Sequence, residues 1–153
     1  MLSQLQHSLQ NLGYNPANTP QPGGNYLAVR KAANGLYVAI QFPIFEQQFQ
    51  FQGRLGAELT TQQGYTAARM AAAIALFQIE KFNGLAKIAS INHMDFYYQA
   101  SADWDEGPEV ANGASDLFVE VLGEVGQHSR AILGVAQLPR NFSVGLTVVC
   151  SLG

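Results

Sequence analysis

The feature that most constrains this chain is an alanine-rich stretch that carries helix signals at both ends. Thr60 is followed three residues later by Gln63, a spacing typical of a capping box, in which the two residues satisfy backbone N–H groups at a helix start. Gly84 supplies the stop, because glycine readily takes the conformation that ends a helix. We predict a helix from about residue 60 to 83 that lies close on a β-sheet. Its small side chains are Ala67, Ala68, Ala71, Ala72 and Ala75.

Before this helix, the sequence predicts strands at residues 26–31 and 36–42. The residues between them end in Asn34-Gly35, and this pair is expected to supply the positive φ angles of a tight hairpin. A third run, at residues 45–51, alternates phenylalanine with glutamine. It is interpreted either as an edge strand or as a loop over a cleft.

After the helix, the sequence predicts a strand at residues 86–100, a second helix at 108–122 and strands at 130–136 and 143–150. The order ββ(β)-α-β-α-ββ indicates an α+β fold, with a mixed or largely antiparallel sheet and two helices on one face. The other face of the sheet needs a cover. With no third long helix available, another copy of the chain is the natural one.

Composition also favours an association of several copies of the chain. Only 12% of the 153 residues are charged, about half the usual share. A chain of this length fits one domain, here residues 1–153. Residues 1–24 are expected to add a short amphipathic helix and a loop to a core at 25–150. The alternative to an oligomer is a monomer whose surface is solvated by its many glutamines.

Several function classes are disfavoured by charge and residue content. The net charge is −3 and the eight basic residues are scattered, so nucleic acid is an improbable partner. No apolar run is long enough to span a membrane, and no secretory signal is recognised at the start. The single Cys150 suits a reducing compartment, so a cytoplasmic location is expected. The three histidines lack metal-ligand spacing, and neither a metal nor a cofactor is expected.

Short phrases spread over residues 24–150 resemble the RidA (YjgF-like) family in the correct order. They are Gly24-Asn25-Tyr26, Gln41-Phe42-Pro43, Gly64 with Ala67-Ala68-Arg69, Asn112-Gly113-Ala114-Ser115-Asp116-Leu117, and Arg130 followed by Gly134-Val135-Ala136-Gln137-Leu138-Pro139. The resemblance implies a chorismate-mutase-like fold and a homotrimer with a central β-barrel and three clefts between subunits. It also implies that Arg130 grips the carboxylate of a 2-imino or enamine acid, which water hydrolyses to a 2-keto acid and ammonia.

The same resemblance assigns other residues to the cleft. These ligand-binding candidates are Tyr26, Ile40, Asn112, Ile132 and Pro139. A guanidinium suits a carboxylate because it can present two parallel N–H donors. The alternative for Arg130 is a structural role, either as an ion-pair partner of Glu120, Glu124 or another subunit, or as a donor to loop carbonyls.

Two positions depart from the deaminating members of that family. A Ser-Gly pair is replaced by Ala39-Ile40, and the glutamate that positions the water is replaced by Gly145. General acid–base help is commonly worth about 10²- to 10⁴-fold, so a poor deaminase is expected unless His128 substitutes. Two functions therefore stay open: a carboxylate-binding trimer with imine hydrolysis, and a non-enzymatic binding protein. An endoribonuclease activity, also attributed to the family, is disfavoured by the charge.

Overall fold

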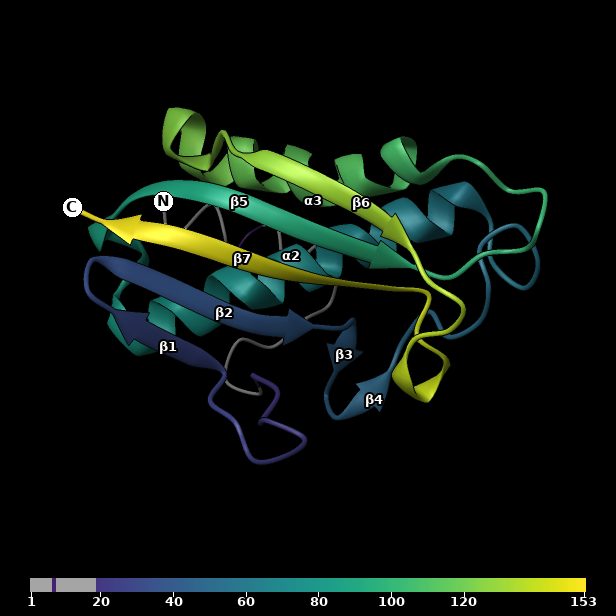
Figure 1. The fold of residues 1–153 in the computed structure, drawn as a ribbon, viewed down its shortest axis with the longest axis horizontal. Helices are drawn as coiled ribbons and strands as arrows, with labels where there is room; N and C mark the ends of the chain where they lie inside the picture. The colour runs from purple at the N-terminus through teal and green to yellow at the C-terminus, as the bar shows by residue number, and fades with distance from the viewer. Residues whose placement is uncertain (1–6, 8–18) are drawn as a thin grey trace.

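The computed structural model describes residue 7 and residues 19–153. The short amphipathic helix predicted within residues 1–24 falls, except for residue 7, outside this described part. A five-stranded sheet, in the order β1-β2-β7-β5-β6, dominates the fold (Figure 1). Its strands are β1 (Val29–Ala32), β2 (Gly35–Gln41), β5 (Ile88–Tyr98), β6 (Ser129–Gly134) and β7 (Val144–Leu152).

Strand directions confirm the predicted mixed sheet. Strands β5 and β6 run parallel, whereas the pairs β1–β2, β2–β7 and β5–β7 are antiparallel. A parallel pair needs a crossover, and helix α3 (Gly107–Leu122) supplies it between β5 and β6. Helices α2 (Thr61–Asn83) and α3 lie together behind the sheet in Figure 1. The α+β fold with two helices on one face is therefore confirmed.

Helix α2 begins and ends where the sequence predicts. The Thr60 side chain accepts a hydrogen bond from the Gln63 backbone N–H at 3.1 Å, and the Gln63 side chain accepts one from the Thr60 N–H at 2.8 Å. Gly84, with φ of 90°, donates its N–H to the Glu80 carbonyl and closes the helix. These local bonds explain why the helix limits could be predicted from sequence.

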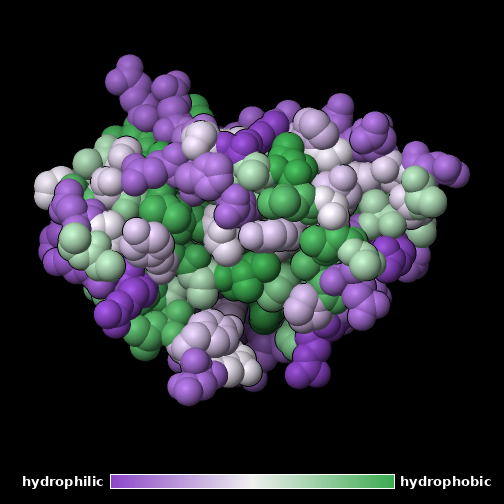
Figure 2. Space-filling view, in the orientation of Figure 1, coloured by the Kyte–Doolittle hydropathy of each residue, from purple (hydrophilic) through white to green (hydrophobic). Residues whose placement is uncertain are grey.

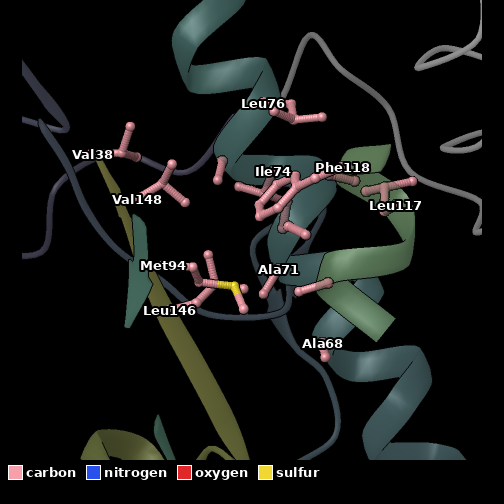
Figure 3. Packing of buried hydrophobic residues seen from close by; sticks show 14 of the residues in the cluster. Val38, Ala68, Ala71, Ile74, Leu76, Met94, Leu117, Phe118, Leu146 and Val148 are labelled. Carbon is pink, nitrogen blue, oxygen red and sulfur yellow. The ribbon is translucent and has the colours of Figure 1, made fainter. Parts of the chain in front are cut away.

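The core lies between the helices and the sheet. In Figure 3, Met94, Leu146 and Val148 of the sheet point toward Ala71 and Ile74 of helix α2. All five are at most 1% exposed, and the alanine face of α2 is fully buried as predicted. Small side chains on this face let the helix backbone approach the sheet, so the larger strand residues fill the space between them.

Helices α2 and α3 approach each other closely at Gly113. A Cβ atom at this position would lie 2.1 Å from the backbone oxygen of Tyr65, closer than any side chain can be accommodated. Glycine therefore sets the distance between the two helices and, with it, the place of the α3 residues on either side of Gly113.

The other face of the sheet is uncovered in this single chain. Tyr37 and Leu133 are 51% and 42% exposed, and Figure 2 shows hydrophobic residues over the middle of this face among more polar ones. His93 also lies here, with its Nδ1 atom 2.7 Å from Ser129 Oγ and its Nε2 atom 2.9 Å from Asp95 Oδ1. No helix of the described residues is long and apolar enough to cross a membrane.

The first hairpin differs from the sequence prediction in two respects. Strand β1 begins at Val29, so Tyr26 precedes it in a bend. The positive φ of the turn lies at Ala33 (50°), not at the Asn-Gly pair. Asn34 has a long-range role instead: its side chain donates to the Leu152 carbonyl at 2.7 Å, and its own carbonyl accepts from the Leu152 N–H. Tertiary contacts outweigh the local turn preference here.

The phenylalanine-glutamine run forms a separate hairpin rather than an edge of the main sheet. Strands β3 (Ile44–Phe45) and β4 (Gln48–Phe49) pair only with each other, and the turn between them has positive φ at Glu46 and Gln47. Residues of this hairpin also line a cavity. Of the two interpretations that the sequence leaves open, the structure therefore favours the segment beside a cleft over the edge strand.

Candidate functional site

Arg130 lies on β6, an edge strand, and its side chain reaches back to helix α3. Its Nη1 atom donates to Asn112 Oδ1 at 2.8 Å and to Ser115 Oγ at 3.0 Å. Both bonds use the same nitrogen, so the Nε–Nη2 edge keeps the two parallel donors that a carboxylate can accept. The guanidinium is therefore held in place by neutral groups without using its bidentate edge.

No acidic residue among the described ones pairs with Arg130. Glu120, one of the partners considered from sequence, forms an ion pair with Arg69 instead. Glu124 is exposed, and no ion pair with Arg130 is formed. A structural ion pair within the chain is therefore not what fixes Arg130.

His128 is connected to Arg130 through Ser115. Its Nδ1 atom is 2.6 Å from the Gly126 carbonyl, which can only accept, so this nitrogen carries a hydrogen. Its Nε2 atom, 2.9 Å from Ser115 Oγ, then accepts the hydroxyl hydrogen while Ser115 accepts from Arg130. The ring also packs edge-on against Phe118. His128 precedes β6, which begins at Ser129, so it lies just outside the strand. The Nδ1 atom thus fixes the ring, and the Nε2 atom helps to orient Ser115, which in turn positions the Arg130 side chain.

Ile132 follows Arg130 by two residues and points to the same side of the sheet. It is partly buried against the core, and its Cγ2 atom lies 3.2 Å from the position of a Cβ at Gly107. Asn112, Ile132 and Arg130 are thus brought to one edge of the molecule.

The other three candidates line a cavity at the opposite edge of the sheet. Tyr26, Ile40 and Pro139 border a space of about 610 Å³ together with residues of the β3–β4 hairpin. Tyr26 is 50% exposed, and its hydroxyl accepts a hydrogen bond from the Gly23 N–H at 3.1 Å. The lining of the cavity is mostly apolar, which is typical of small-molecule sites.

The place where the resemblance puts a glutamate is filled by other side chains. A Cβ atom on Gly145 would lie 2.7 Å from Phe42 Cε1 and 3.0 Å from Ile40 Cδ1. Phe42 is itself stacked on Phe142, with ring centroids 4.7 Å apart. The acid is therefore missing, and the space next to the backbone that it would need is occupied.

One chain does not bring all predicted site residues together. Arg130 and Ile132 lie on β6, with His128 just before it and Asn112 on the neighbouring helix α3. Tyr26 and Ile40 lie by β1 and β2, at the other end of the strand order. Figure 1 shows the two edge strands β6 and β1 on opposite sides of the sheet. Sequence reasoning missed Ser115, although its spacing of three from Asn112 on a helix places both on one face.

Two titratable groups outside these sites, Cys150 and Tyr65, have raised pKa values. Burial raises the pKa of the Cys150 thiol to about 12, so the thiol stays protonated, as expected for a buried hydrophobe. The pKa of Tyr65 is raised, chiefly by its hydrogen bond to Asp116. Among the described residues, no three His, Cys, Asp or Glu side chains lie together as metal ligands would.

Comparison with known proteins identifies the family. The family described as "YjgF/chorismate mutase-like, putative endoribonuclease" matches residues 10–151, and the chain therefore belongs to this family. Protein TCP17 of Trypanosoma cruzi is 34% identical over 147 residues, which are 95% of this chain and 92% of that protein.

Solved structures agree with this assignment. The protein Atu1372 of Agrobacterium tumefaciens, described as of unknown function, is 30% identical, with a TM-score of 0.86 over 99% of this chain and 94% of that chain. A protein of Shewanella oneidensis described as "a putative endoribonuclease" is 29% identical, with a TM-score of 0.89 over 97% and 99% of the two chains. The fold predicted from the resemblance is confirmed.

Proposed function

We propose that this protein is a homotrimer that binds a small carboxylate metabolite, a 2-keto or 2-imino acid, in clefts between subunits. In each cleft Arg130 of one subunit grips the carboxylate. Tyr26, Ile40 and Pro139 of the neighbouring subunit form the opposite wall. The observation that carries this proposal is the open bidentate edge of an Arg130 fixed by Asn112 and Ser115.

Two further observations support an assembly of copies. The candidate residues are divided between opposite edges of one sheet, so a second subunit is needed to face Arg130 with Tyr26 and Ile40. The sheet face in Figure 2 also leaves Tyr37 and Leu133 exposed. A structure of the same fold, Escherichia coli TdcF, which is 16% identical, has serine bound, so this fold can hold a small molecule with a carboxylate.

Binding without fast hydrolysis is the activity that the packing favours. Imine hydrolysis needs a group that positions and activates water, and the space at Gly145 is filled by Phe42 and Ile40. His128 is no ready substitute, since both of its nitrogens are engaged by Ser115 and Gly126. We therefore expect the protein to accelerate imine hydrolysis weakly or not at all.

RNA cleavage, which the family description mentions, has less support. RNA binding needs several unpaired cationic side chains on the protein surface that follow the phosphate backbone of the RNA. Arg69 is neutralised by Glu120, and Arg54 is engaged with two backbone carbonyls. The sequence-based expectation that nucleic acid is not a partner is kept as part of this proposal.

Calorimetric titration with 2-oxobutyrate, combined with light scattering to determine the oligomeric state, tests the proposal. We expect a trimer that binds the keto acid, and we expect Arg130→Ala to abolish binding without dissociating the trimer. Lys87→Ala, which removes an exposed cation outside the strands of the sheet, is the control and should bind normally. A monomer, or equal binding by wild type and Arg130→Ala, would contradict the proposal.

The enzymatic alternative is separated by a second measurement. Ammonia release from an imino acid generated in situ is followed with and without the protein. We expect little acceleration at high protein concentration. A large acceleration that Arg130→Ala removes would show that hydrolysis proceeds without the family's acid.

A further inference from the structure

A second arginine stands at the rim of the apolar cavity, and it belongs to the same chain as the cavity walls. Arg140 is exposed and lines the cavity beside Pro139. Among the described residues, no acidic side chain forms an ion pair with it. A cation without an acidic partner at the mouth of an apolar space is a position where a ligand's negative group could be held.

Arg140 also lines a second, polar hollow of about 410 Å³. This hollow is bordered by Arg54, Gln137 and Asn141, with no acidic residue in its lining. The Arg54 guanidinium is fixed there, because it donates to the carbonyls of Ala100 at 3.1 Å and Ala136 at 2.5 Å. Two of the eight basic residues of a chain of net charge −3 thus border one small hollow. Such an arrangement favours an anion.

The turn that presents Arg140 is held in an uncommon backbone conformation. Arg140 and Asn141 have φ of 56° and 59°, the left-handed region that residues with a Cβ seldom adopt. Gln99, only 1% exposed, holds this turn from both sides: it accepts from the Leu138 N–H at 2.7 Å and donates to Asn141 Oδ1 at 2.8 Å. The strained backbone of this turn is maintained by the buried Gln99 side chain. Such strain indicates a functional reason for the position of the turn.

The apolar side of the site is built from aromatic rings. Phe142 is stacked on Phe42 at 4.7 Å and meets Phe49 edge-on at 5.1 Å. Phe42, Phe49 and Phe142 all line the cavity, with Ile40 beside them. A keto acid with only two or three carbons besides its carboxylate would contact little of these walls. The walls suit a longer aliphatic or aromatic tail.

We propose that the cavity and the arginine-lined hollow form one site within a single chain for an amphipathic carboxylate. Arg140, assisted by Arg54, would bind the carboxylate, and the phenylalanine-lined cavity would bind an apolar tail. This site shares the walls Tyr26 and Ile40 with the cleft proposed above. Its cations are different, so it does not depend on Arg130.

Calorimetric titration with octanoate tests this inference, with octanol, octylammonium and acetate as comparisons. We expect octanoate to bind most tightly, because only octanoate has both the tail and the negative charge. Arg140→Ala should weaken octanoate binding about tenfold, and Arg140→Lys, which keeps the charge, should weaken it less. The control Lys87→Ala should leave it unchanged.

Arg130→Ala separates this inference from the proposed function. It should remove binding of 2-oxobutyrate and retain binding of octanoate. If Arg130→Ala lost octanoate binding while Arg140→Ala kept it, the inference would be overturned. The tail would then be assigned to the cleft between subunits. Equal binding of octanoate and octylammonium would overturn it as well, since the site would then not recognise the negative charge. Absence of octanoate binding to the wild type would also refute it, whatever the result with 2-oxobutyrate.

Discussion

The Cδ1 atom of Ile40 lies 3.0 Å from the position that a Cβ atom on Gly145 would take. By the resemblance, these two positions correspond to a glycine and an acid of the deaminating family members. Ile40 lies where the β2–β7 register shifts, between Val38 and Gln41. The two departures are therefore one structural change: the larger residue occupies the space that the smaller one leaves.

Gly145→Ala should destabilise the protein by roughly 1–3 kcal/mol, the usual cost of adding a methyl group to filled space. Urea unfolding measures this change. Gly23→Ala, where an added Cβ meets nothing within 4 Å, is the control and should be nearly neutral. In a Phe42→Ala background the cost of Gly145→Ala should fall. An equal cost in both backgrounds would show that the Phe42 ring is not the obstacle.

Ser115→Ala should weaken 2-oxobutyrate binding about 3- to 10-fold, because Arg130 loses one of the two acceptors that position it. Titration calorimetry measures the affinity, and urea unfolding should show little change for this half-exposed residue. Ser129→Ala, on the uncovered sheet face, is the control and should bind normally. Unchanged binding in Ser115→Ala would mean that Asn112 alone fixes the guanidinium.

Cys150 should make the protein less stable at alkaline pH. Its pKa is about 12 in the folded state and about 9 when solvated, so the protonated thiol favours folding fully below pH 9. This contribution is lost as the pH rises from 9 toward 12, by about 1 kcal/mol at pH 10. Urea unfolding of wild type and Cys150→Ala from pH 8 to 10.5 tests it. Parallel pH profiles for the two proteins would contradict the expectation.

Ala33→Gly should stabilise the first hairpin. A left-handed φ of 50° costs an alanine about 1–2 kcal/mol, whereas glycine adopts it freely at an entropic cost of about 0.5–1 kcal/mol. We expect a gain of up to about 1 kcal/mol in thermal or urea unfolding. Ala32→Gly, in the strand next to the turn, should be destabilising. A loss of stability in both variants would show that the turn conformation is not strained.

Local signals account for the parts of the fold that could be predicted. The capping box of Thr60 and Gln63 and the stop at Gly84 involve residues within a few positions of each other, so their chemistry is visible in the sequence. The alanine face of α2 follows helical periodicity in the same way. The mixed sheet with two helices on one face then follows from the order of the elements along the chain.

Long-range geometry accounts for the parts that could not. Asn34 is the expected turn residue, yet it bonds to Leu152, 118 positions away. The link from Arg130 through Ser115 to His128 depends on how α3 lies against β6. The sequence shows that Gly145 lacks an acid, but only the strand register shows which side chains fill the space.

The division of the candidate residues between two edges of the sheet has a genetic consequence for an assembly of identical chains. Each subunit would contribute Arg130 to one cleft and Tyr26 to another. A chain altered at Arg130 and a chain altered at Tyr26 would each be defective alone. When the two kinds of chain assemble together, some clefts would receive an intact Arg130 from one chain and an intact Tyr26 from the other. The two defective alleles would therefore complement each other.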